Sequence, residues 1–92
     1  MSRRKEEVRV QIKYLASVRE RTGRRLEEAR FARGSTLTDV AAWLAARYGL
    51  RLPDPNLIAT LNGKGWNQLP DKLDSRIRNG DVICLFPVVS GG

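Results

Sequence analysis

The residues of this chain that are best suited to chemistry are its last two, Gly91 and Gly92. Glycine lacks a Cβ, so two glycines in succession can pass through a channel that is too narrow for any other residue. The α-carboxylate of Gly92 would be ionised at neutral pH and a poor electrophile until it is activated. A partner that adenylates it would create a mixed anhydride, which a sulfur or an amine nucleophile can attack. We therefore expect Gly91 and Gly92 to be the working end of the protein.

The rest of the sequence offers few catalytic groups. It contains no histidine, the commonest general base and metal ligand. The segment Asn62-Gly63-Lys64-Gly65 lacks the spacing of a phosphate-binding loop and is interpreted as a hairpin turn. The single cysteine, Cys84, lies in an apolar run and is interpreted as a small buried hydrophobic residue. We expect no metal and no cofactor, and we do not expect the chain to be an enzyme alone.

Two strands and a short helical turn are predicted first along the chain. Val8 to Tyr14 alternates apolar and polar residues, which indicates a half-buried strand. Ser17 and Glu20 have the spacing of a capping box, and Gly23 would end the turn of helix that follows. Residues 24–32 are expected to return as a second strand, paired with the first in a hairpin.

One helix is the clearest local pattern in the sequence. Thr36 and Asp39 have capping-box spacing at its start, and Gly49 follows as its C-terminal stop. Between them an apolar stripe recurs at helical spacing, formed by Leu37, Val40, Ala41, Leu44, Ala45 and Tyr48. The pattern predicts a helix that packs against a sheet along this stripe.

Three further strand signals follow the helix. Residues 57–61 indicate a strand that ends at the turn Asn62-Gly63, and residues 82–86 indicate a near-continuously buried strand after the turn at residues 79–81. Residues 66–73 are expected to hold a short edge strand, because Pro70 is unsuited to a central one.

This order predicts an α+β protein with a mixed sheet of four to five strands and one main helix packed on one face. That is the order of the β-grasp, or ubiquitin-like, fold. The expected domains are a flexible basic tail at 1–7, the β-grasp domain at 8–86 and an extended functional tail at 87–92.

Length and composition limit the classes of function. A chain of 92 residues forms one domain, and neither a membrane span nor a signal peptide is visible, so we expect a cytoplasmic protein. The net charge is +7, but the cations are scattered from Arg3 to Arg78 without interleaved aromatic residues, which disfavours nucleic-acid binding. The charge is still suited to steering an acidic partner.

The sequence resembles the small subunits of molybdopterin synthase and, more broadly, the ubiquitin-like sulfur carriers. The matching segments are Tyr14 to Gly23, the helix from Thr36 to Gly49, the turn Asn62-Gly63 and, most closely, Asn79 to Gly92. The resemblance covers the chain from about Val8 to its end.

This resemblance implies a mechanism. An adenylating enzyme similar to ubiquitin E1 would activate Gly92 with ATP, and a sulfur donor would convert it to a thiocarboxylate. The tail would then enter the large subunit of molybdopterin synthase, expected in a heterotetramer, and give its sulfur to cyclic pyranopterin monophosphate. In this scheme Gly91 is a slender lead-in, and Pro87, Val88, Val89 and Ser90 form the threaded tail. Phe86 and Leu15 match the family's apolar docking face, to which Trp66 is expected to contribute unless it is packed in the core.

Three alternatives remain open. A related carrier would serve thiamine synthesis, tRNA thiolation, the tungsten cofactor or amino-acid synthesis. Thiamine carriers are usually shorter than this chain, which favours the molybdopterin pathway. A protein modifier would use the same activated tail to form isopeptide bonds with lysines. In a basic binding module, Gly91 and Gly92 would be incidental.

Overall fold

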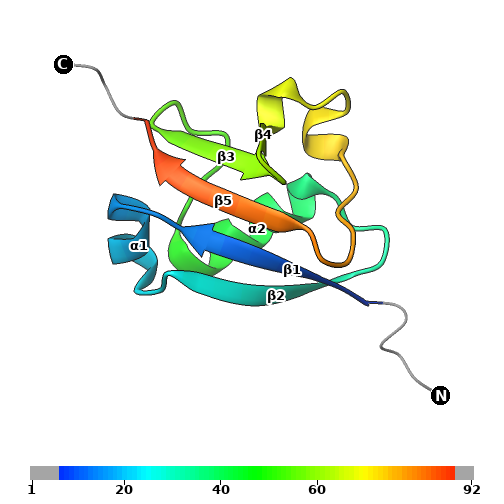
Figure 1. Ribbon diagram of the computed structural model, residues 1–92, viewed down its shortest axis with the longest axis horizontal. Helices are drawn as coiled ribbons and strands as arrows, with labels where there is room; N and C mark the ends of the chain where they lie inside the picture. The colour runs from blue at the N-terminus through cyan, green and yellow to red at the C-terminus, as the bar shows by residue number, and fades with distance from the viewer. Residues whose placement is uncertain (1–6, 89–92) are drawn as a thin grey trace.

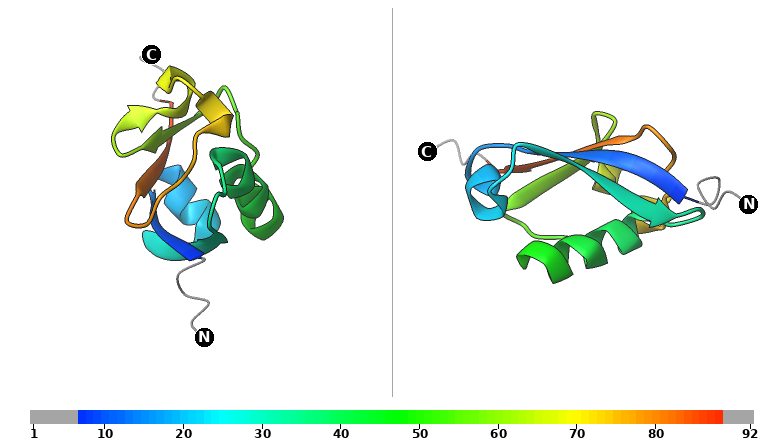
Figure 2. Two further views of the ribbon diagram at one scale, coloured as in Figure 1. Left: turned by 90° about the vertical axis from the view of Figure 1, so that its right-hand side faces the viewer. Right: turned by 90° about the horizontal axis from the view of Figure 1, so that it is seen from below.

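The structure is a computed structural model that describes residues 7–88. Five strands form one mixed sheet in the order β2-β1-β5-β3-β4, and the longer helix, α2, lies across one face (Figures 1 and 2). The predicted β-grasp architecture is therefore confirmed. The strands are β1 (Glu7–Tyr14), β2 (Leu26–Ala32), β3 (Leu57–Leu61), β4 (Lys64–Gly65) and β5 (Val82–Pro87). Glu7 and Pro87, expected in the two tails, thus belong to strands.

The hairpin of β1 and β2 contributes buried side chains to the face of the sheet that packs against α2. Every second residue of β1 is buried, from Val8 to Tyr14, as its alternation predicted. β2 pairs antiparallel with it, and Ala29 lies opposite Val10 on the buried face. β2 starts at Leu26, two residues later than the predicted strand.

The helix α2 (Leu37–Tyr48) confirms the predicted boundaries. The Asp39 carboxylate accepts a hydrogen bond of 2.8 Å from the Thr36 backbone N–H, which satisfies one of the free donors at the helix start. At the other end Gly49 adopts a φ of 70°, which glycine reaches without a steric penalty. Leu37, Val40 and Leu44 are fully buried beneath the sheet.

The short helix α1 (Ser17–Thr22) corrects one prediction. Ala16 is its N-cap, with φ 53°, and no side chain caps the helix, so Ser17 and Glu20 form no capping box. The reason is that the Leu15 N–H still bonds to the Leu85 carbonyl at 3.0 Å, and the chain turns only at Ala16. Ser17 is then already inside the helix. Gly23 ends α1 as predicted.

The region after the turn Asn62-Gly63 also differs from the prediction. The turn is tight, with positive φ at both residues, so the return strand β4 starts at once at Lys64 and lasts two residues. No edge strand forms in residues 66–73, where the structure has two 3₁₀ turns, η2 (Trp66–Gln68) and η3 (Lys72–Asp74). The Gln68 side chain accepts a bond from the Gly65 N–H at 3.3 Å, which favours a turn over continued pairing.

The strand β5 is central, but it is buried on one face only. It pairs parallel with β1 and antiparallel with β3. Ile83 and Leu85 are fully buried, whereas Val82, Cys84 and Phe86 are half-buried on the side away from α2. The predicted near-continuous burial of this strand is therefore wrong, and Cys84, expected to be buried, is only half-buried. The physical reason is that no helix among residues 7–88 covers this outer face (Figure 2).

Candidate functional site

The site predicted from the sequence begins where β5 ends. The Val88 N–H donates a 2.9 Å hydrogen bond to the Asn56 carbonyl, which extends the β3–β5 pairing by one step beyond Pro87. β5 is paired on both sides up to Leu85, and from Phe86 to Val88 it is paired on the β3 side alone. Val89, Ser90, Gly91 and Gly92 lie outside the described residues.

A row of apolar residues crosses the outer face of the sheet at this exit. In the ladder of β3 and β5, Ile58 lies opposite Phe86. In the parallel ladder Tyr14 lies opposite Leu85, so the next residues along, Leu15 and Phe86, are adjacent at the ends of β1 and β5. Since side chains alternate along a strand, Leu15, Phe86 and Ile58 all face away from α2. We call these three residues the exit row.

The exit row is partly open to solvent. Leu15 is 47% exposed, and Phe86 and Ile58 are half-buried. Val88, directly after β5, is 44% exposed and adds to the apolar surface. An exposed apolar cluster of this kind is typical of a protein-binding surface.

The structure places two of the three predicted docking residues together and the third, Trp66, elsewhere. Phe86 and Leu15, predicted as docking residues, lie side by side at the exit of the tail. Trp66 does not join them as an exposed anchor, because its side chain is only 7% exposed and belongs to the core. Of the two roles considered for Trp66, packing is the one that the structure shows.

Sequence reasoning missed Ile58. The run Leu57–Leu61 is almost entirely apolar, so its sequence does not reveal which residues face outward. The register of β3 against β5 decides this, and it places Leu57, Ala59 and Leu61 toward α2. The two-residue turn at Asn62-Gly63 fixes only the register of β3 against β4.

The titratable groups with perturbed pKa values lie on the α2 side of the sheet, on the opposite face from the exit row. Burial raises the pKa of the Tyr14 hydroxyl, and its hydrogen bond to Glu27 acts in the same direction. The hydrogen bond of Arg47 to Tyr48 raises the pKa of that guanidinium. These groups belong to a network between β1, β2 and α2 that holds the fold together. Among residues 7–88 no group of three or more His, Cys, Asp or Glu side chains is placed to hold a metal ion.

No helix in the described part of the chain is long and apolar enough to cross a membrane.

Comparisons with known proteins agree with this geometry. The model of the ThiS family matches residues 12–92. The putative molybdopterin converting factor subunit 1 of Pyrococcus furiosus is 24% identical, with a TM-score of 0.75 over 89% of this chain and 99% of that one. The small archaeal modifier protein 1 of Methanosarcina acetivorans is 23% identical, with a TM-score of 0.74 over 94% and 98%.

A third similar structure is a complex. It contains subunits 1 and 2 of the molybdopterin-converting factor of Helicobacter pylori; the matching chain is 25% identical, with a TM-score of 0.61 over 92% of this chain and 100% of that one. No curated protein sequence matches the chain significantly.

Proposed function

Because this chain belongs to the ThiS family of small ubiquitin-like sulfur carriers and modifiers, we propose that it carries sulfur for molybdopterin synthesis on the α-carboxylate of Gly92. The family's members carry an activated group and leave catalysis to their partner enzymes. The family match extends through Gly91 and Gly92, which supports a role for these two residues.

The observation that carries the proposal is the position of β5. The strand lies between β1 and β3 and ends at Pro87, five residues before Gly92 in the sequence (Figure 1). The exit row, Leu15, Phe86 and Ile58, surrounds the point at which the chain leaves the sheet. A partner that binds this row is positioned to receive the tail in its own active site, since the apolar contact fixes where the tail enters.

The chemistry follows from the inertness of a carboxylate. Attack of the Gly92 carboxylate on the α-phosphorus of ATP forms an acyl adenylate and releases pyrophosphate. Hydrosulfide from a sulfur donor then displaces AMP, so the carbonyl carbon exchanges a C–O bond for a C–S bond. The product thiocarboxylate is a nucleophile that can deliver sulfur to a second substrate. The carrier supplies the reacting carbonyl and the exit row, and its partners supply ATP and the sulfur donor.

Two partners are proposed. The first is an adenylating enzyme similar to ubiquitin E1, and the second is the large subunit of a molybdopterin synthase. The similarity to one chain of the Helicobacter pylori complex, at 25% identity over the whole of that chain, supports the second partner and the choice of pathway.

Pyrophosphate exchange tests the first step directly. The purified chain, an E1-like enzyme from the same cells, ATP and labelled pyrophosphate should give labelled ATP only if the carboxylate of Gly92 is adenylated. Deletion of Gly92 should abolish the exchange and leave the melting temperature unchanged, because terminal residues contribute little packing. A deletion variant that exchanged pyrophosphate at the full rate would refute the proposed site.

A further inference from the structure

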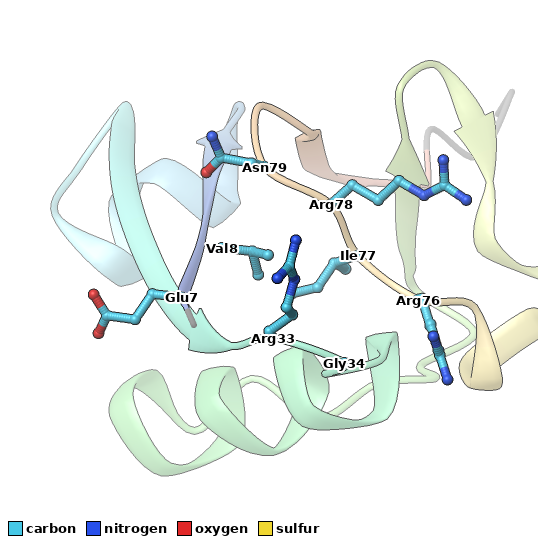
Figure 3. A pocket seen from close by; sticks show the side chains of 8 residues that line it. All are labelled: Glu7, Val8, Arg33, Gly34, Arg76, Ile77, Arg78 and Asn79. Carbon is cyan, nitrogen blue, oxygen red and sulfur yellow. The ribbon is translucent and has the colours of Figure 1, made fainter. Parts of the chain in front are cut away.

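A depression of about 700 Å³ lies at the end of the sheet where β1 and β5 begin. Its floor includes Val8 and Ile77, both almost fully buried. Three arginines line it: Arg33 follows β2, and Arg76 and Arg78 belong to the segment before β5 (Figure 3). We call this feature the arginine depression.

Among the described residues, few negative charges balance the three arginines of the depression. Within residues 7–88, Arg33, Arg76 and Arg78 are exposed and none of them forms an ion pair. Glu7 also lines the depression, but in Figure 3 its carboxylate points away from the three guanidinium groups. Nearby, Arg9 on β1 lies opposite Arg30 on β2, and Arg30 is paired with Glu28 at 3.8 Å.

The backbone that carries the arginines is held firmly. The Ile77 N–H donates a 3.0 Å hydrogen bond to the Ser35 carbonyl, which joins the two arginine-bearing segments. The Arg78 N–H donates to the Asp81 carboxylate at 2.7 Å. Since the Cα positions are fixed in this way, a ligand has to order only the side chains.

The arrangement of the charges indicates the kind of ligand. In Figure 3, the guanidinium group of Arg33 lies between Val8 and Ile77, whereas the side chains of Arg76 and Arg78 extend away from Arg33 and away from each other. The three charges are therefore spread around the depression and not gathered at one point. Several carboxylates along an extended segment match such a spread better than one phosphate group does, and each can be held by two parallel N–H···O bonds.

A nucleic acid fits the depression less well. No aromatic side chain is among the described residues that line it, so a base has no platform on which to stack.

The depression and the exit row lie at opposite ends of the molecule. Because β1 and β5 are parallel, both begin at the arginine depression, and β5 runs roughly 15–20 Å from there to Pro87. A partner held at the depression therefore leaves the tail exit free (Figure 1).

We propose that the arginine depression is a docking site for an acidic segment of a partner protein, separate from the surface around the tail. The net charge of +7 would speed the encounter with such a partner, and the three guanidinium groups would fix its position. This inference holds whether or not Gly92 carries sulfur.

The test uses the full chain and a fluorescent peptide of alternating Asp and Glu, followed by anisotropy at low salt. The variant R33Q/R76Q/R78Q should bind the peptide at least about tenfold more weakly than the native chain. The matched control R19Q/R25Q/R51Q removes the same charge from exposed positions near the other end of the molecule, and it should bind within about threefold of the native chain.

Three results would overturn the inference. Equal losses in both variants would mean that net charge alone attracts the peptide. No measurable binding of the peptide by the native chain would mean that no such site exists. Tighter binding of a single-stranded RNA oligonucleotide, lost in R33Q/R76Q/R78Q and retained in the control, would assign the depression to nucleic acid.

Discussion

The hydroxyl of Tyr14 on β1 donates a hydrogen bond of 2.7 Å to the carboxylate of Glu27 on β2, inside the core. Glu27 is only 8% exposed, and it also accepts a hydrogen bond from the Tyr48 hydroxyl on α2. Arg47 and Arg24 lie within 3.5 Å and 3.9 Å of the same carboxylate, from the solvent side. This one side chain thus connects the first hairpin to the main helix.

Replacement of Glu27 by alanine should destabilise the fold by about 1–3 kcal/mol, because the buried Tyr14 hydroxyl would lose its acceptor. The matched control is Glu28→Ala on the outer face of β2, where the exposed pair with Arg30 at 3.8 Å contributes little. Urea unfolding of both variants measures the difference. A Glu27→Ala loss no larger than that of Glu28→Ala would contradict a structural role for the network.

The same network predicts how stability depends on pH. Burial raises the folded-state pKa of Tyr14 above its usual value. Below about pH 10 the hydroxyl is protonated in both states, so its stabilising effect is fully present. Above that pH the unfolded chain releases the proton while the folded chain retains it, so stability falls as pH rises, by up to about 1.4 kcal/mol per pH unit. The slope of unfolding free energy against pH between 9 and 11 should be shallower in Tyr14→Phe. Equal slopes in the two proteins would show that Tyr14 keeps its usual pKa.

Glu27 also shows why the second strand was hard to predict from the sequence. Its alternation is weak because a glutamate occupies a core-facing position of β2, while Leu26 is 48% exposed on the outer face. The groups that donate hydrogen bonds to this buried carboxylate come from β1 and α2, so they come together only in the folded protein. By contrast, β1 and α2 were predictable, since their apolar periodicity and the bond from the Thr36 N–H to Asp39 are local.

The outward face of β5 was unpredictable for a related reason. All five residues from Val82 to Phe86 are apolar, so only the register against β1 and β3 separates Ile83 and Leu85 from the outer residues. The candidate site was therefore predictable at Phe86 and Leu15, through a family resemblance, but not at Ile58. The burial of Trp66 also depends on tertiary contacts, because it follows from the 3₁₀ turn that starts there.

The role of the exit row can be tested with two leucines of equal exposure. Leu15 is 47% exposed beside the tail exit, and Leu26 is 48% exposed on β2, farther from that exit. Leu15→Ser should weaken binding to the large subunit by at least about tenfold, and Leu26→Ser by less than about twofold. Calorimetric titration measures both affinities. Equal losses would show that general surface hydrophobicity, rather than the exit row, drives the association.

Trp66 gives a prediction about stability. Its indole N–H is buried and has no hydrogen-bond partner among the described residues. Trp66→Phe keeps most of the apolar contact and removes the unpaired donor, so it should change stability by less than about 1.5 kcal/mol. Trp66→Ala should cost about 3–5 kcal/mol through the cavity that it leaves. Thermal or urea unfolding distinguishes them, and a large loss in Trp66→Phe would reveal a partner for the N–H.

Conversion of Gly92 to a thiocarboxylate can be detected in the intact mass of the protein purified from its own cells without a C-terminal tag. Replacement of one oxygen by sulfur adds about 16 Da, and we expect this heavier species in the native chain. Iodoacetamide should alkylate the sulfur of this heavier species, which distinguishes it from a protein with an oxidised side chain of the same mass. The variant that lacks Gly92 should not give the alkylated species. Two observations together would contradict this expectation: this chain shows only its unmodified mass, and other proteins from the same cells carry a Gly-Gly remnant on lysine. That outcome would identify the chain as a protein modifier.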